Sequence, residues 1–307
     1  MSTKYEKLII DGNNLLYRAF FSRNQPVFIN NIDIGPIYRF LNMLKALVDY
    51  HLPKEIYFTW DKRLNPDVVN FRRELYPEYK TNRVESEDRT KIHIYCEIAI
   101  ALCNSLGIKT ILPYDLEADD VIYYLANKVS IDKKCLIISS DRDLLQLVNH
   151  NVHQFLPAKN TIVDLSNFEG YAGCDPVHFI LYKAIMGDVS DNIKGLNKFG
   201  VVRAKTLAEK INNDLENSDD ITDEQRNIIT VNLKIMDLKY GLVYRPNDEK
   251  YFTEQLNAAN NNVFNGEGFI ALTEQYGLGG FRRQLGSWNA LFNQNTSIDD
   301  WFSNITM

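Results

Sequence analysis

The segment Cys135-Leu-Ile-Ile-Ser-Ser-Asp-Arg-Asp-Leu-Leu-Gln-Leu147 joins an apolar run directly to two carboxylates, Asp141 and Asp143. The apolar run is short enough to be a buried strand, and the fold itself needs no acids where such a strand ends. In an open α/β sheet, ligands bind in the crevice beyond the carboxyl ends of the strands. The segment therefore predicts a central strand with a functional site at its end.

Other segments end in carboxylates in the same way. Apolar runs lead to Asp11 and Asp61, and the stretch 111–120 ends with three more acids, at positions 117–120, at the predicted start of a helix. Those three acids are Glu117, Asp119 and Asp120. The helix dipole favours acids in a first turn, which alone could account for this last group. It does not account for acids that follow strands, so we expect all of them to share one site at the sheet edge.

Strand and helix patterns alternate up to about residue 175. The predicted strands are 4–11, 55–60, 108–112 and 135–139, and the predicted helices are 13–21, 36–50, 92–106 and 118–129. This alternation is typical of an α/β fold with a mostly parallel central sheet flanked by helices. From Asp175-Pro176, which suit an N-cap and a first helical residue, the chain reads as helical. We expect an α/β domain at 1–175 and a helical domain at 176–307, with an α-rich tail from about 246.

The acids at the sheet edge predict a divalent metal site. Carboxylate oxygens suit Mg²⁺, with Mn²⁺ as a substitute, and no His or Cys is placed to favour zinc. So many acids in one crevice would repel each other unless cations lay between them. Two divalent ions about 4 Å apart can stabilise both the attacking and the leaving oxygen of a phosphoryl displacement. The pattern therefore indicates phosphodiester chemistry.

A second motif, Lys183-Ala-Ile-Met-Gly-Asp188-Val-Ser-Asp191-Asn-Ile-Lys194-Gly195, brackets two more acids with glycines. It opens a predicted helix-turn-helix at about 183–211, where a helix N-terminus could bind a phosphate. The candidate phosphate-binding residues of this region are Lys183, Lys194, Lys198, Arg203 and Lys205. Alone, the pattern fits an ordinary helical hairpin equally well. Beside the acidic pair it favours a clamp on a nucleic acid duplex.

The segment 62–91 is charged, carries tyrosines and lacks aliphatic runs. On composition alone, such a segment is a solvated and mobile loop. Its motif Tyr79-Lys80-Thr-Asn-Arg83 places a lysine and an arginine three residues apart, where they would share one helical face. The adjacent tyrosine could stack on a base. The segment thus has either a solvated or a substrate-binding role.

Composition and charge set broad limits. The 307 residues contain no apolar run long enough to span a bilayer and no signal-peptide core, so an intracellular, cytoplasmic protein without a membrane partner is expected. The four cysteines form no CxxC pair and are expected to be buried thiols. The formal charge is −6, but it would be +3 without the nine carboxylates of the expected site. Total charge therefore does not exclude a nucleic acid partner.

Five motifs, in this order and spacing, resemble the 5′ nuclease family. They are Asp11-Gly-Asn-Asn-Leu-Leu-Tyr-Arg18, Tyr79-Lys80-Thr-Asn-Arg83, Glu117-Ala-Asp119-Asp120, Ser140-Asp141-Arg-Asp143 and Met186-Gly-Asp188-Val-Ser-Asp191-Asn192. Together they cover roughly residues 4–245, and five ordered motifs are far more specific than one. The family comprises bacteriophage 5′→3′ exonucleases and flap endonucleases, phage RNase H enzymes of the same fold and the 5′ nuclease domain of bacterial DNA polymerase I. Without a polymerase region, the chain is most similar to the stand-alone phage type.

The resemblance implies a PIN-like 5′ nuclease fold with a helical arch at about 62–91 and a helix-three-turn-helix at about 183–211. It also implies two metal sites. The first would be held by Asp11, Asp61, Glu117 and Asp119 with Asp120 nearby, and the second by Asp141, Asp143, Asp188 and Asp191. Because Asn197-Lys198 and Val202 depart from the family's helix-three-turn-helix pattern, no monovalent cation is assigned there.

Roles for individual basic residues also follow from the resemblance. Lys80 would stabilise the scissile phosphate and Arg83 a neighbouring one, both from the arch. Lys80, Arg83 and Asp141 are the candidate catalytic residues. Tyr79 would contact the nucleic acid, and Arg18 would either meet a phosphate or simply be exposed.

The function implied is an Mg²⁺-dependent, structure-specific 5′ nuclease that removes RNA primers or 5′ flaps during DNA replication. Its partners would be DNA with a 5′ flap or 5′ end, or an RNA/DNA hybrid, and the enzyme would be a monomer. The tail segment 297–305 would be a docked amphipathic end or a peptide for a replication protein. One alternative is a haloacid-dehalogenase-like phosphatase, which Asn13 disfavours because that family needs Asp-x-Asp. Another is a non-catalytic DNA-junction binding protein, which would gain nothing by facing phosphates with nine carboxylates.

Overall fold

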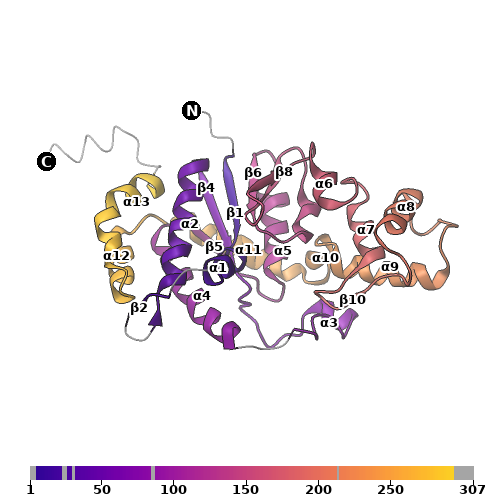
Figure 1. Ribbon diagram of the computed structural model, residues 1–307, viewed down its shortest axis with the longest axis horizontal. Coiled ribbons are helices and arrows are strands. Elements are labelled where there is room, and N and C mark those ends of the chain that lie inside the picture. The colour runs from indigo at the N-terminus through magenta and orange to yellow at the C-terminus, as the bar shows by residue number, and fades with distance from the viewer. Residues whose placement is uncertain (1–4, 23–25, 30–31, 84–86, 213, 294–307) are drawn as a thin grey trace. The chain divides into compact units, whose positions relative to one another are not determined.

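The computed structural model describes residues 5–22, 26–29, 32–83, 87–212 and 214–293 (Figure 1). Its residues form two compact units, each described by itself below. The first unit comprises Met1–Trp60, Glu87–Ile111 and Thr253–Met307, and the second comprises Asp61–Ser86 and Leu112–Phe252. The domain boundary expected near residue 175 stays a prediction, because compactness in space does not decide which segments fold or act together.

Three parallel strands form the core of the first unit. They are β1 (Lys7–Asp11), β4 (Glu55–Thr59) and β5 (Lys109–Ile111), with β4 between the other two. The helices are α1 (Gly12–Phe20), α2 (Gly35–His51), α4 (Glu87–Ser105), α12 (Gly266–Gln275) and α13 (Leu285–Phe292), with a 3-10 turn at Gly279–Gln284. A short hairpin of β2 (Phe28–Ile29) and β3 (Ile32–Asp33) precedes α2. Leu8, Ile9 and Ile10 are fully buried, as the apolar run predicts.

The turn from β1 into α1 explains why Gly12 follows Asp11. Asp11 is the N-cap of α1, and its side chain accepts a hydrogen bond of 2.9 Å from the backbone N–H of Asn14. A Cβ atom at Gly12 would lie 2.5 Å from the indole ring of Trp60, so only glycine fits. The predicted position of Asp11, at the carboxyl end of the first strand, is confirmed.

The second unit contains β6 (Cys135–Ile138) and β7 (Val152–Leu156) in parallel, with β8 (Thr161–Val163) antiparallel to β7. Its helices are α3 (Phe71–Leu75), α5 (Ala118–Tyr124), α6 (Phe168–Ala172), α7 (Phe179–Met186), α8 (Val201–Ile211), α9 (Asp223–Met236) and α10 (Lys239–Tyr244). A π-helical turn (Leu125–Val129) continues α5, and a 3-10 turn spans Asp143–Leu147. Helix α11 (Pro246–Ala259) contains the boundary between the units. All four residues of β6 are buried, as predicted for a central strand.

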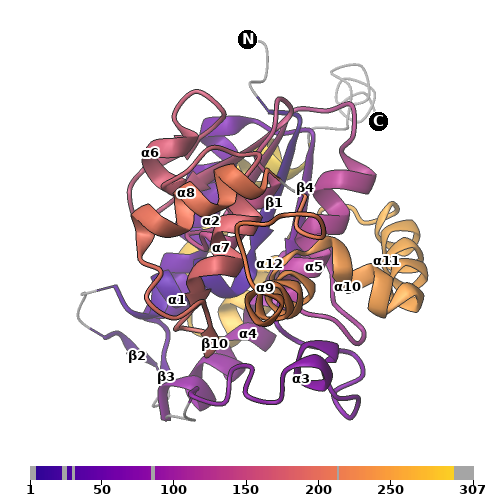
Figure 2. The same cartoon turned by 90° about the vertical axis from the view of Figure 1, so that its right-hand side faces the viewer.

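The helical part of the second unit is built around α7. Figures 1 and 2 both show α7 beside α8, and α7 also packs on α9. Ile185, Leu207 and Ile229, one from each helix, belong to one buried apolar cluster. The hairpin of β9 (Gly187–Asp188) and β10 (Ile193–Lys194) lies between α7 and α8 in the chain. The predicted pair of helices near 183–211 is therefore present, but joined by a hairpin and a turn.

Several element boundaries differ from the sequence-based predictions. Helix α4 begins at Glu87, whereas the predicted start was residue 92. The prediction was late because the first turn of the helix lies in a charged stretch without an apolar pattern. Asp175 caps a turn by accepting the N–H of Val177 and of His178, so Pro176 is not the first residue of α7. The described part of 62–91 contains one short helix, α3, then turns, and then the start of α4. Residues 84–86 of the expected arch and the segment 297–305 lie outside the described residues.

Two predictions about the whole chain can also be compared with the structure. All four cysteines are buried, and none of these described thiols is in a disulfide, as predicted. Among the described helices, none combines the length and apolar character needed to cross a membrane.

Candidate functional site

The second unit carries eight of the nine predicted metal-binding acids. These are Asp61, Glu117, Asp119, Asp120, Asp141, Asp143, Asp188 and Asp191. They come from the loop after residue 60, the start of α5, the loop after β6, and the β9–β10 hairpin. The ninth acid, Asp11, belongs to the first unit. The segments that carry the eight acids are therefore those that the sequence predicted.

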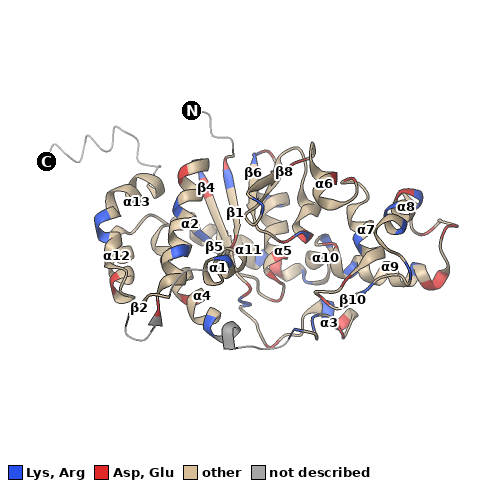
Figure 3. Cartoon of the chain, viewed as in Figure 1, with Lys and Arg blue, Asp and Glu red and all other residues tan. Residues whose placement is uncertain are grey.

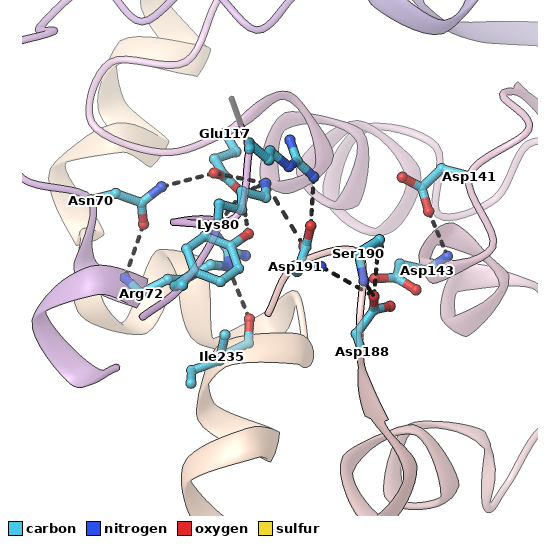
Figure 4. Close-up of polar contacts among 12 residues, drawn as sticks. Asn70, Arg72, Lys80, Glu117, Asp141, Asp143, Asp188, Ser190, Asp191 and Ile235 are labelled. Carbon is cyan, nitrogen blue, oxygen red and sulfur yellow. Dashed lines mark hydrogen bonds and ion pairs between the residues drawn. The ribbon is translucent and has the colours of Figure 1, made fainter. Parts of the chain in front are cut away.

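One group of contacts surrounds Glu117, the N-cap residue of α5 (Figure 4). Its carboxylate accepts hydrogen bonds from Asn70 Nδ2 at 3.0 Å, Tyr79 OH at 2.9 Å and Lys80 Nζ at 2.9 and 3.0 Å. Burial acts to raise the pKa of Glu117, but Lys80 and then Arg72 oppose it and the pKa falls to about 2. Glu117 is thus held ionised at neutral pH. Asp61 lies beside this group and accepts the N–H of Ala118 at 3.2 Å.

The turn that carries Lys80 and Arg83 is fastened to the β9–β10 hairpin. The Lys80 N–H donates to the Asp191 carbonyl at 2.9 Å, and the Lys80 Nζ lies 3.9 Å from the Asp191 carboxylate. Arg83 Nη2 contacts the same carboxylate at 2.5 Å. Lys80 has a φ of +58°, in the left-handed region. The prediction that Lys80 and Arg83 share a helical face is therefore wrong, because a turn holds both of them.

A second group of contacts surrounds Lys183 on α7. Its Nζ lies 2.5 Å from Asp143 Oδ1 and 2.8 Å from Asp188 Oδ2. Burial acts to raise the pKa of Asp188, but Lys183 and Ser190 lower it to about 2. Asp141 accepts the Asp143 N–H at 2.8 Å, and desolvation followed by repulsion from Asp143 raises the pKa of Asp141 to about 6. The Asp141 residue is exposed to solvent, and the Asp143 carboxylate beside it disfavours a second negative charge there.

Glycine makes the hairpin that presents Asp188 and Asp191 possible. Gly187 has a φ of +71°, and a Cβ there would lie 2.3 Å from the backbone nitrogen of Gly195. The two glycines that bracket the motif therefore allow the two strands of the hairpin to approach closely. Asp188 Oδ1 accepts the Ser190 N–H at 2.8 Å, which fixes the turn between the two acids.

The donor atoms of the site suit a divalent ion in their chemistry, although their present spacing does not enclose one. Within the described ranges, no three His, Cys, Asp or Glu side chains lie close enough together to hold a metal ion. Instead, Lys80 lies between Glu117 and Asp191 (Figure 4). Lys183 lies between Asp143 and Asp188. The atoms available as metal ligands are carboxylate oxygens, which hard cations such as Mg²⁺ prefer. A bound ion would compete with the two lysines for the same oxygens.

Asp120 has a different environment from the other acids. It is fully buried, and Arg72 holds its two oxygens at 2.7 and 2.8 Å. It also accepts the Glu117 N–H at 3.0 Å and so completes the capping box of α5. The geometry therefore assigns Asp120 to a buried ion pair that fixes the start of α5. Neither of its oxygens is left without a protein partner.

Tyr79 is also placed differently from the prediction. Only 3% of it is exposed, and its hydroxyl donates to Glu117. A ring buried in this way is not available to stack on a base, because its hydroxyl and faces are already packed against the protein. Tyr79 therefore orients Glu117, and the interpretation as a base-stacking residue is corrected.

The predicted phosphate-binding residues divide into exposed and paired side chains. Lys194, Lys198 and Arg203 are exposed, and Figure 3 shows the basic residues of α8 among acidic ones. Lys205 pairs with Glu169, and Lys183 pairs with Asp143 and Asp188. Arg18, on α1 in the first unit, is exposed. The exposed side chains are the ones placed to meet a phosphate directly.

Replacing Tyr79 with phenylalanine tests its assignment. Tyr79→Phe keeps the ring but removes the hydrogen bond to Glu117, so we expect divalent metal affinity to fall about 10–100-fold, as for other residues that orient metal ligands. The measurement is calorimetric titration with Mn²⁺ alongside DNA binding in EDTA. If Tyr79 acted only as a base-stacking residue, metal affinity and DNA binding would both stay at the wild-type level, because phenylalanine keeps the ring that stacks.

Acidic side chains at the start of α5, beyond the end of β6 and in the β9–β10 hairpin, with lysines between them, are typical of hydrolases that act on phosphate esters. The chain belongs to the 5′-3′ exonuclease family. The family model for the 5′-3′ exonuclease N-terminal resolvase-like domain matches residues 6–172. That model covers the β1, Glu117 and Asp141 segments of the site.

Individual relatives agree with this family. The 5′-3′ exonuclease of Buchnera aphidicola subsp. Schizaphis graminum is 32% identical over 208 residues, which cover 67% of this chain and 70% of that protein. The 5′-3′ exonuclease of Aquifex aeolicus is 30% identical over 247 residues, which cover 79% and 81%. Among solved structures, the T5 D15 protein co-crystallized with metal ions has a TM-score of 0.70 at 22% identity and covers 82% of this chain and 99% of its own. This last likeness confirms the predicted fold class.

Proposed function

We propose that the protein is a structure-specific 5′ nuclease, a metal-dependent enzyme that hydrolyses phosphodiesters at 5′ ends and 5′ flaps of DNA. The observation that carries the proposal is the carboxylate site of the second unit, in which Lys80 and Lys183 already lie against the acids. Membership of the 5′-3′ exonuclease family supports the reaction type. It also removes the reason to retain the phosphatase and the non-catalytic binding protein as alternatives.

Two groups of acids would hold divalent ions, with Mg²⁺ as the natural ion and Mn²⁺ as a substitute. In the second unit, one group is Asp61, Glu117 and Asp119, and the other is Asp141, Asp143, Asp188 and Asp191. Asp11, which only the family resemblance adds to the first group, belongs to the first unit. Bound ions would supply an activated water and neutralise charge on the reacting phosphate. The acids would orient the ions, and Lys80 and Arg72 keep Glu117 ionised and able to do so.

Lys80 and Arg83 would bind substrate phosphates once the carboxylates they now contact are shared with bound ions. Support comes from a cleft of about 330 Å³ beside Lys80. Arg63, Asn70 and Arg73 line it together with Lys80 and Glu117. Arg63, Arg73 and Lys80 supply positive charge beside the acidic site. This arrangement suits a polyanion, one phosphate of which must reach the acids. Developing negative charge on that phosphate would be stabilised by the Lys80 ammonium.

The duplex would lie against the helical part of the second unit. The exposed side chains of Lys194, Lys198 and Arg203 near the start of α8 are the proposed phosphate contacts, and Arg18 on α1 is another. The finer biology is also a proposal. The substrates would be RNA primers or 5′ flaps formed in DNA replication, including RNA/DNA hybrids, and the enzyme would act as a cytoplasmic monomer.

Cleavage of a duplex with a labelled 5′ single-stranded flap tests the function. In Mg²⁺ we expect cutting near the junction of single and double strand, and in excess EDTA we expect none, because the carboxylates bind the substrate only with ions between them. A duplex with a 3′ flap is the matched control and should stay intact. Hydrolysis of a small phosphomonoester, with both flaps untouched, would contradict the proposal.

A further inference from the structure

Three side chains connect the last two turns of α9, directly or through one further residue, to three of the segments that carry the site's acids. The first contact is through Asn232, which is 2% exposed. Its Nδ2 donates to the Ala184 carbonyl at 2.8 Å and to the Lys194 carbonyl at 2.9 Å. Ala184 lies in α7 and Lys194 in β10, on either side of the hairpin that presents Asp188 and Asp191. One amide thus fixes both ends of that hairpin to α9.

The second contact is through Arg72. Its Nε donates to the Ile235 carbonyl at 2.9 Å, as Figure 4 shows, while its other two nitrogens hold Asp120. Asp120 in turn caps the start of α5, where Glu117 lies. A guanidinium has five donors in one rigid plane. Its bonds to Ile235 and Asp120 therefore fix the position of the start of α5 relative to the end of α9. The side chain of Arg72 is only 3% exposed, which excludes water from these bonds.

The third contact is through Gln146. Its Nε2 donates to the Asp143 carbonyl at 2.7 Å and to the Met236 carbonyl at 3.2 Å. Its Oε1 accepts the Leu238 N–H at 3.0 Å. The side-chain amide therefore connects the 3-10 turn that begins at Asp143 to the residues that end α9. None of the three side chains is a carboxylate, and each makes at least two hydrogen bonds.

We propose that Asn232, Arg72 and Gln146 are positioning residues that use the end of α9 as a common reference, and that they set the separation between the Glu117, Asp143 and Asp188 carboxylates. The inference rests on the proposed function, because the separation matters only if these acids hold ions. The carbonyls of Ile235 and Met236 are adjacent in the chain, so a shift of one segment is transmitted to the others through the rigid helix. The spacing of two bound ions would then be a property of α9 rather than of the acids alone.

Electron paramagnetic resonance of the full-length protein with two equivalents of Mn²⁺ alone measures this spacing. Magnetic coupling between two Mn²⁺ ions falls steeply with their separation, so it reports a change that a loss of activity would not distinguish. In Gln146→Met and in Asn232→Leu, which keep side-chain size but remove the donors, we expect weaker coupling. We also expect the affinity of the more weakly held ion to fall about 10–100-fold. The exposed Asn227 of the same helix supplies the matched control, Asn227→Leu, with unchanged coupling.

Each outcome has a separate meaning. Coupling and affinity in both variants equal to those of the wild type would overturn the inference and leave the nuclease proposal standing, since flap cleavage is measured separately. Wild-type protein that binds no Mn²⁺ would overturn both. If Asn232→Leu fails to fold, Gln146→Met still decides the matter, because Gln146 is only half-buried.

Discussion

Asp141→Asn is expected to abolish cleavage while leaving the fold and DNA binding intact. An asparagine keeps the acceptor for the Asp143 N–H, which is 2.8 Å from Asp141 Oδ1, so the loop after β6 keeps its conformation. It carries no charge and binds a hard cation weakly. Losing several kcal/mol of charge stabilisation corresponds to a fall in kcat of at least about 1,000-fold. Single-turnover cleavage of the 5′ flap substrate in Mg²⁺ measures it.

The matched control is Asp132→Asn, which removes the same charge from an exposed position outside the site. We expect wild-type kcat for this variant. DNA binding in EDTA should be equal or tighter in Asp141→Asn, because one negative charge that faces the phosphates is gone. Retention of more than about a tenth of the wild-type rate would show that Asp141 is not needed to hold an ion.

Arg72→Met is expected to be the most destabilising substitution at the site. It leaves the fully buried Asp120 carboxylate without its cation and the Ile235 carbonyl without its donor. Removing one partner of a buried ion pair costs about 3–5 kcal/mol, because the remaining charge stays buried. Urea denaturation in EDTA measures the free energy of unfolding without a contribution from metal. The neighbouring Arg73→Met is the matched control. Arg73 is exposed and its Nε donates to the Tyr79 carbonyl at 3.2 Å, so we expect a loss of about 1 kcal/mol or less.

A double variant separates stability from positioning. Arg72→Met combined with Asp120→Leu replaces the buried pair with apolar side chains, which is often neutral for stability. We expect it to regain most of the lost free energy of unfolding but not the cleavage rate, because the capping box that fixes Glu117 is gone. Equal stability of Arg72→Met and Arg73→Met would mean that the Arg72 to Asp120 pair contributes nothing to folding.

Much of the fold could be predicted from short apolar runs. β1, β4 and β6 were predicted because each contains a run of aliphatic or aromatic residues that leads within a few positions to an acid. β7 was missed because Gln154 interrupts its apolar pattern. That side chain is fully buried, and its Nε2 donates to the carbonyls of Ser139 at 3.0 Å and Asp141 at 2.5 Å. A polar residue that supports the site from within a strand gives no signal in the sequence.

The acids of the site could be predicted from the sequence. The residues that fix the positions of those acids could not. Arg72 and Arg73 look alike in the sequence, yet one is buried and the other is exposed. The difference comes from Asp120, 48 positions further along the chain, which only the fold brings into contact with Arg72. The same holds for Tyr79, whose hydroxyl meets Glu117 across 38 positions. The local sequence pattern identifies the acids that follow strands. Which side chains hold those acids in position depends on contacts between residues far apart in the chain.

The buried cysteines make site-directed spectroscopic labelling practical. Cys174 is fully buried, and desolvation, followed by repulsion from Asp175, raises its pKa to about 12. Desolvation also raises the pKa of Cys103, so little reactive thiolate forms at neutral pH at either position. Cys96 and Cys135 are likewise buried. A maleimide dye should therefore react with a new surface cysteine, placed for example at Asn227, without prior removal of the four native ones.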